Sequence, residues 1–145
     1  TQFQINDYAE YVRVVSLMRL PNAVFVFGSN LKGIHGAGAA KDAHDLYGAT
    51  YGNGDGPQGR AYAIPTKDQH MNTRELEEIA SSVYALLIYA SIRPDTTFAV
   101  TRIGCGLAGF NDFQIAPLFN MAPENCHLPT HWREIIAGEK FSLNW

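Results

Sequence analysis

The sequence has few cysteines, and they show no spacing that is typical of disulfides or of metal ligands. Among its 145 residues only Cys105 and Cys126 carry thiols, and neither belongs to a Cys-x-x-Cys pair. This scarcity disfavours both a disulfide framework and a structural zinc site, and it favours two free thiols in a reducing compartment. We therefore expect a cytoplasmic protein.

Long apolar runs are also missing. The most apolar segment, residues 83–92, is interrupted by tyrosine and serine and falls short of the roughly 18 residues that a membrane span needs. The N-terminus has neither a basic stretch nor a long apolar one, so we expect no secretory segment. These features predict no association with a membrane.

Positive charge is neither abundant nor clustered. Eleven lysines and arginines are scattered among 14 acidic residues, which gives a net charge of -3. A protein that follows the backbone of a long nucleic acid needs a basic stripe, so such partners are not expected. The length and the 46% hydrophobic content predict a single domain, residues 1–145, around one core.

The spacing of apolar residues predicts alternating helices and strands. Helices are expected over residues 6–19 and 37–47, from Asn72 or Thr73 to just before Pro94, and from Asn111 or Asp112 onward. Strands are expected over residues 24–27, over 61–64 with Pro65 as the stop, over 97–101, and around His127. The alternation indicates an α/β sheet with helices on both faces.

Two segments share one design, in which a buried strand leads through a glycine-rich loop into a helix. They are residues 24–40 and 97–119. Ligands of such sheets lie at the carboxyl ends of strands, and each helix N-terminus attracts anions through unpaired N–H groups and a positive dipole end. Two such ends would suit two phosphates. The alternative is that these glycines only make tight turns.

A third glycine-rich segment, residues 52–59, contains the literal pattern G-x-G-x-x-G at Gly54, Gly56 and Gly59. A dinucleotide fingerprint joins a strand directly to a helix. Here Pro57 intervenes and a short strand follows, so we reject that interpretation. The segment is instead expected to be a loop and a candidate flap that becomes ordered when ligand binds.

Three stretches carry a resemblance to a known family. The run Asn-Leu-Lys-Gly-Ile-His-Gly-Ala-Gly-Ala-Ala at residues 30–40 resembles the loop of macro domains, in which an asparagine precedes a glycine-rich stretch that opens a helix. Residues 65–67 and 101–108 are similar to the branch that contains terminal ADP-ribose glycohydrolases. The matched segments extend from about Val24 to Phe119 in the family's order. The resemblance implies a three-layer α/β/α fold with a mixed sheet that binds ADP-ribose.

The resemblance also implies which residues bind. Two stretches would embrace the diphosphate and the distal ribose, namely Gly36, Ala37, Gly38 and Ala39, and Gly104, Cys105, Gly106, Leu107, Ala108 and Gly109. Asn30 is a candidate hydrogen-bond partner of the distal ribose, although a turn after a strand also suits asparagine. His35 could donate to a phosphate or a ribose hydroxyl, or simply face solvent. Phe110 or Phe27 could stack on adenine, or belong to the core.

In the glycohydrolase branch a lysine attacks the anomeric carbon and a nearby aspartate assists. Lys67 matches the lysine, but Ala108 stands at the position of the aspartate. The acid–base partner is therefore missing, which leaves open whether the site turns over. Asp112 could replace that aspartate only if the loop folds back, and a helix N-cap is already a sufficient role for it.

Two other groups of residues are candidates for a reactive thiol and for a metal site. Cys105, flanked by glycines, could be an activated thiol, but no histidine can be placed beside it, so a packing role is favoured. His127 and His131 lie near Cys126, but Pro129 breaks any helix that would align them, and no metal is expected.

Three functions follow from these residues. The first is binding or sequestering of ADP-ribose or a related NAD-derived nucleotide, with no further cofactor. The second is an ADP-ribosyl hydrolase acting through Lys67 or through a water oriented by Asn30, and the third is an interaction module without a nucleotide ligand. The sequence leaves the oligomeric state open, while Trp132, Phe141 and Trp145 indicate that the tail docks on an apolar surface.

Overall fold

The computed structural model describes residues 5–143, with the side chains of residues 8–139. Within this range the chain forms a five-stranded sheet in the order β2-β3-β1-β4-β5. The pairs β1–β3, β1–β4 and β4–β5 are parallel, whereas β2 joins the edge of β3 in the antiparallel sense. The sheet is therefore mixed, and the expected α/β class is confirmed.

The predicted helices and strands occur in the predicted order, but residues 56–58, expected to belong to a loop, form the additional strand β2. The helices are α1 (Ile5–Met18), α2 (Gly38–Tyr47), α3 (Leu76–Ser91), α4 (Asp112–Ile115), the 3₁₀ helix η1 (Ala116–Phe119) and α5 (Thr130–Leu143). The strands are β1 (Ala23–Asn30), β2 (Gly56–Gln58), β3 (Ala61–Lys67), β4 (Thr97–Val100) and β5 (Cys126–His127). No helix in residues 5–143 is both long and apolar enough to cross a membrane.

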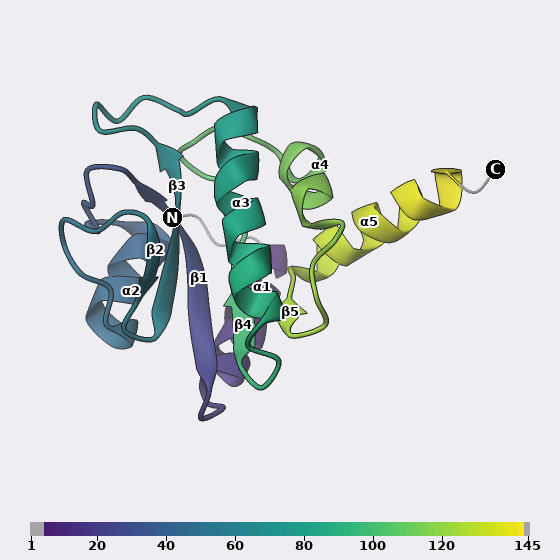
Figure 1. Ribbon diagram of the computed structural model, residues 1–145, viewed down its shortest axis with the longest axis horizontal. Helices are drawn as coiled ribbons and strands as arrows, with labels where there is room; N and C mark the ends of the chain where they lie inside the picture. Colours follow the sequence, from purple (N-terminus) through teal and green to yellow (C-terminus); the bar gives the residue numbers. More distant parts are fainter. Residues whose placement is uncertain (1–4, 144–145) are drawn as a thin grey trace.

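Helices cover both faces of the sheet (Figure 1). On one face, α1 and α2 pack against Phe25, Phe27 and Ala63. On the other, α3, η1 and α5 enclose a larger core around Val26 and Phe98. Successive residues of β1 thus enter opposite cores, as expected of a continuous apolar strand that is buried on both sides.

β3 continues beyond the proline that was expected to end it. Pro65 lies inside the strand, where it pairs with Ser29 of β1. β2 ends opposite Ala63, so at Pro65 the strand has a ladder partner in β1 alone. A proline is tolerated at such a position because one side of the strand needs no N–H donor.

The start of α3 also differs from the prediction. The N-cap is Glu75, whose backbone N–H donates to the carboxylate of Glu78 over 3.0 Å. Asn72 and Thr73, the predicted caps, lie in a tight turn in which the Asp68 carboxylate accepts from the N–H of Asn72 over 3.0 Å. The prediction of the cap was therefore wrong, because these two residues serve the turn.

The C-terminal segment, for which no helix was predicted, forms α5 and extends away from the body of the domain (Figure 1). Trp132 at its start is fully buried, and its ring centroid lies 5.2 Å from that of Phe119. Docking of the tail is therefore confirmed for Trp132. The side chains of Phe141 and Trp145 lie outside the described residues.

Candidate functional site

The carboxyl ends of β1, β3 and β4 lie at one edge of the sheet, at the top of Figure 1. The loops of residues 31–37, 68–75 and 101–111 begin there. In parallel sheets this edge is the usual position of a ligand. It contains two of the predicted residues side by side, because Asn30 at the end of β1 is in register with Lys67 at the end of β3.

The side chain of Asn30 closes the loop that follows it. Its Nδ2 donates to the carbonyl of Ile34 over 2.9 Å, and its Oδ1 accepts from the N–H of Ile34 over 3.0 Å. The residue is buried. The structure thus gives Asn30 the turn role, and contact with a ribose stays a prediction.

His35 is fully buried, so the alternative of a ring that simply faces solvent is wrong. Its Nε2 lies 2.9 Å from the carbonyl oxygen of Thr50 and 3.0 Å from that of Asn53. Because both neighbours can only accept, Nε2 carries the proton and donates to them. The proton that could have reached a ligand is therefore used to hold residues 50–53.

Residues 50–54 are packed against the first loop, and the ordering of residues 52–59 by a ligand stays a prediction. A Cβ placed on Gly54 would lie 1.7 Å from the carbonyl oxygen of Asn30, and one on Gly33 would lie 2.3 Å from the carbonyl carbon of Gly52. The Ser29 hydroxyl donates to the carbonyl of Gly54. These glycines allow two backbones to touch, so their abundance does not indicate mobility here.

The N-terminus of α2 has no cap. Ala37 occupies the N-cap position in an extended conformation, makes no side-chain hydrogen bond, and is followed by a first turn without acidic residues. Gly36, Ala37 and Gly38 are exposed, and a Cβ on Gly38 would meet no atom within 4 Å. The first amides of a helix lack acceptors within it, so this end offers N–H groups to an anion.

The second glycine-rich loop differs from the first in the helix that follows it. Asn111 is the N-cap of α4, because its side chain accepts from the N–H of Gln114, whereas the cap role was expected for Asp112. α4 has four residues and continues directly into η1. Because its first turn is capped, it offers fewer free amides than the start of α2, and anion binding at this second helix end stays a prediction.

Two contacts of Thr73 bring Ala108, the residue at the position where the resemblance expects an aspartate, close to Lys67. Thr73 forms a β-bridge with Lys67, and its hydroxyl donates to the carbonyl of Ala108 over 3.1 Å. Lys67 is half-buried, and its ammonium makes no hydrogen bond or ion pair with the residues that the structure describes. Lysine and alanine thus occupy neighbouring positions, without a carboxylate between them.

A cluster that the sequence did not reveal holds the base of the second loop. The Asp112 carboxylate accepts from Arg102 Nε over 3.1 Å and Nη2 over 2.8 Å, and from Trp132 Nε1 over 2.6 Å. Burial alone would raise the pKa of Asp112, but hydrogen bonds from Arg102 and Trp132 outweigh it and hold this pKa below its ordinary 3.8. Trp132 was placed only in an unassigned tail, so no local pattern predicted the contact.

Because Asp112 is bound in this way, it does not replace the missing aspartate. Cys105 lies beside it, with Sγ 3.6 Å from Oδ1. Burial, followed by the charge of Asp112, raises the pKa of the Cys105 thiol to about 12, which disfavours a thiolate at neutral pH. Cys105 also packs against the larger core, as expected of the packing role favoured for it.

The remaining predicted residues of the second loop are mostly accessible. Gly106, Leu107 and Gly109 are exposed, Ala108 and Phe110 are half-buried, and Gly104 is buried. Phe27 is fully buried in the core, so it is not available to stack on adenine. Phe110 packs partly against the larger core, and its stacking on adenine stays a prediction.

Histidines and cysteines do not gather into a metal site in the described part of the chain. His127 belongs to β5 and His131 to α5, with Pro129 just before the helix. A surface hollow of about 430 Å³ lies between η1, β5 and α5, and it is lined by residues that include Asn120, Cys126 and Arg133. It is separate from the loops that follow β1, β3 and β4.

No family model, no curated protein and no solved structure matches the chain. The resemblance to macro domains therefore rests on the three stretches quoted for it. To these stretches the structure adds their positions: Asn30, Lys67 and Ala108 lie at one edge of the sheet, together with the uncapped start of α2. Any function has to be argued from that edge.

Proposed function

We propose that the chain is a macro-domain-like module that binds ADP-ribose or a related NAD-derived nucleotide at the carboxyl edge of its sheet. The observation that carries the proposal is the uncapped N-terminus of the ten-residue helix α2. It lies in the stretch of residues 30–40, which resembles the macro-domain loop. A phosphate at this end would accept hydrogen bonds from amides that have no other acceptor in the helix.

Two further features of the same edge support an anionic ligand. The Lys67 ammonium has no partner in the described residues, so a phosphate or carboxylate would provide one. The exposed glycines Gly36 and Gly38, with Gly106 and Gly109 in the other loop, leave the backbone accessible without a Cβ in the way. The dipole of α2 adds roughly 0.3 to 1 kcal/mol for an anion near its first turn.

Binding is favoured over turnover because neither position considered for the assisting carboxylate provides a free one. Ala108 stands at the position of the assisting carboxylate, and the Asp112 carboxylate is bound by Arg102 and Trp132. Attack by a lysine requires the neutral amine and a group to accept or return its proton. Hydrolysis through Lys67 is the second candidate function, because the Lys67 ammonium lies at the carboxyl edge of the sheet and has no partner in the described residues.

The proposal can be tested by a substitution that affects stability and binding in opposite directions. Ala37 already has the extended backbone of an N-cap, with φ -153° and ψ 158°. Ala37→Asp should therefore cap α2 and stabilise the protein by about 1 kcal/mol. The same carboxylate should occupy the free amides and repel a phosphate, so that ADP-ribose affinity falls at least about tenfold, or ~1.4 kcal/mol.

Calorimetric titration of the full chain with ADP-ribose measures the affinity, and thermal unfolding measures the stability. The wild type should bind with micromolar or tighter affinity, Lys67→Gln more weakly, and Lys41→Gln, whose lysine pairs with Asp45 on the outer side of α2, as the wild type. No heat and no thermal shift for the wild type, or unchanged affinity in Ala37→Asp, would refute the proposal. Release of ADP-ribose from a modified substrate, compared between the wild type and Lys67→Ala, separates binding from hydrolysis.

A further inference from the structure

One face of α3 is apolar, and no described residue covers it. The segment 79–92 contains no charged residue. Its inner side chains, Ile79, Val83, Leu86, Leu87 and Ala90, are buried in the core. Its outer side chains Tyr84, Ile88 and Ile92 are 66%, 48% and 70% exposed. They recur at every fourth residue and so form one stripe along the helix.

The exposed face of α2 differs from that of α3, because it carries mainly charged and polar side chains. α2 also buries one side, yet its exposed residues include Lys41, Asp42, His44 and Asp45. Leu46 is the one large apolar side chain on that surface. A helix that is apolar all round is normally buried all round, so the outer stripe of α3 indicates a surface that is covered in the working protein.

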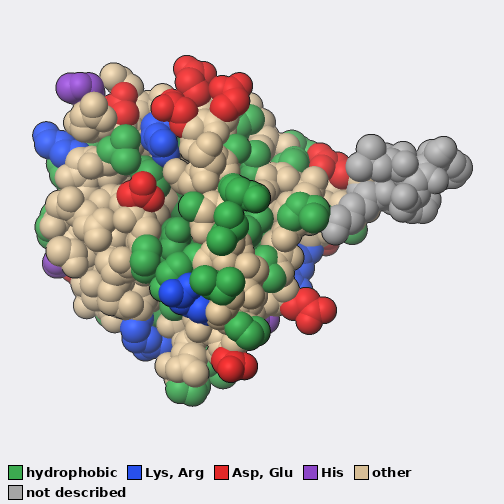
Figure 2. Space-filling view, in the orientation of Figure 1, with side chains coloured by type: hydrophobic (Ala, Val, Ile, Leu, Met, Phe, Trp, Pro, Cys, Tyr) green, Lys and Arg blue, Asp and Glu red, His purple; other side chains and the backbone are tan. Residues whose placement is uncertain are grey.

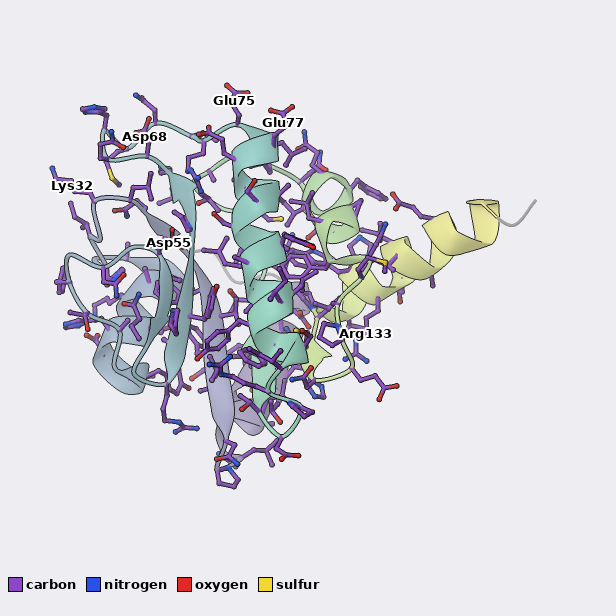
Figure 3. The ribbon with its side chains drawn as sticks, in the orientation of Figure 1. Lys32, Asp55, Asp68, Glu75, Glu77 and Arg133 are labelled. Atoms are coloured by element: carbon purple, nitrogen blue, oxygen red, sulfur yellow. The ribbon has the colours of Figure 1, made fainter. Side chains whose placement is uncertain are left out.

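The two ends of the stripe differ in charge. Glu75, Glu77 and Glu78 are exposed at its N-terminal end. Arg93 follows its C-terminal end, with the guanidinium carbon 3.5 Å from the centroid of the Tyr89 ring, and exposed Asp95 lies two residues further on. Figure 2 shows acidic side chains above a hydrophobic area and both basic and acidic atoms below it, and Figure 3 places Glu75 and Glu77 at the upper end of α3.

We propose that α3 is the contact helix of a two-fold homodimer in which the α3 helices of two copies pack antiparallel. A two-fold interface uses the same patch on both copies, so the patch must complement itself. In the antiparallel arrangement the glutamates of each copy meet Arg93 of the other. A parallel arrangement would instead place glutamates against glutamates, which is unfavourable.

The sizes of the side chains fit the same arrangement. We place Glu77 of one copy opposite Ile92 of the other. Because the helices are antiparallel, the numbers of any two facing residues then add up to about 169. Ser81 then faces Ile88, and Tyr84 faces Ala85. In the two pairs nearest the axis a large side chain thus meets a small one, as close packing of two helices requires. The axis of symmetry passes between Tyr84 and Ala85.

A membrane fits this face less well than a second copy does. Helices that lie on lipid surfaces carry several basic residues beside their apolar stripe, which attract anionic headgroups. Here three glutamates precede the stripe and one arginine follows it. The dimer does not depend on the proposed nucleotide site, so each proposal can fail without the other.

The first test is the mass of the full chain in solution, measured by sedimentation equilibrium from micromolar to millimolar concentration. The wild type should shift from monomer to dimer. Ile88→Glu should remain monomeric with unchanged circular dichroism, because the side chain is already half exposed in the single chain. Leu46→Glu on α2 is the matched control and should dimerise as the wild type does. A wild type that stays monomeric throughout would overturn the proposal.

The second test fixes the direction of the two helices by oxidative cross-linking. Ala85→Cys lies close to the axis, so its two copies should form a disulfide that appears as a covalent dimer on a non-reducing gel. Ser81→Cys lies about three to four residues from the axis, which separates its two copies by roughly 10 Å along the helices, too far for a disulfide. The unsubstituted chain controls for Cys105 and Cys126. Equal cross-linking of both variants would overturn the antiparallel arrangement.

Discussion

The glycine-rich loops that follow β1 and β4 resemble each other in sequence but are held by different forces. The first is fixed by backbone packed against backbone, at Gly33 and Gly54, and by the buried ring of His35. The second is fixed at its base by charged and polar side chains, Asp112 with Arg102 and Trp132. Glycine content alone therefore does not tell which loop is a rigid support and which presents an exposed surface.

The difference continues into the helices that the loops open. The first leads to ten residues of α2 with free amides, and the second to the four residues of α4 with an asparagine cap. A helix start without a cap is thus found at the first loop, whereas the helix after the second loop starts with a capped end. The other loop contributes exposed glycines and the carbonyl of Ala108, which ties it to Thr73.

The largest expected effect comes from a single methyl group in the first loop. Gly54→Ala would place a Cβ 1.7 Å from the carbonyl oxygen of Asn30, so the backbones must separate. We expect a loss of about 3 kcal/mol or more in the free energy of unfolding, measured by urea denaturation. Gly106→Ala in the second loop meets no atom within 4 Å and should change stability by less than about 0.5 kcal/mol. Equal effects would remove the contrast between the loops.

The polar base of the second loop should show a dependence on pH. Asp112→Asn weakens the bonds from Arg102 and should cost about 2 kcal/mol at neutral pH. Because the folded-state pKa of Asp112 lies below 3.8, its contribution is present above pH 3.8 and is lost as the pH falls through the folded value. The gap between wild type and variant should therefore close in acid. Asp55→Asn, at an exposed site, serves as the control, and a gap that persists in acid would contradict the assignment.

The buried histidine of the first loop should have a local effect. His35→Phe keeps an aromatic ring but removes the donor to the carbonyl of Thr50 and one of two donors to that of Asn53, which also accepts from Gln58 Nε2. We expect a loss of about 1 to 2 kcal/mol and faster amide hydrogen exchange in residues 50–54, with exchange in residues 104–110 unchanged. Equal acceleration in both segments would indicate that the loops unfold together.

The smallest effect concerns reactivity alone. Because the pKa of Cys105 is raised to about 12, its alkylation at neutral pH should be slow in the folded chain and should accelerate as the pH rises. The urea-unfolded chain provides the fast reference rate. Rapid labelling of folded Cys105 at neutral pH would show that the second loop opens.

The predictions from sequence succeeded where the determining contacts are local. The helix expected over residues 37–47 is found as α2, and α4 begins at Asp112, one of its two predicted starts. They failed where distant segments meet. The burial of His35 depends on the approach of residues 50–54, and the charge network of Asp112 depends on Trp132, which lies 20 residues further along the chain. Neither contact leaves a signal in the spacing of neighbouring residues.

The bare start of α2 has a consequence for anyone who evolves this protein in the laboratory. Position 37 already has the backbone of a capped helix, so a library screened for heat resistance should enrich aspartate, serine or asparagine there. Each of these side chains would occupy the space proposed for a phosphate. Selection for thermal stability alone is thus expected to produce more stable proteins that no longer bind a nucleotide, and libraries should keep alanine at this position.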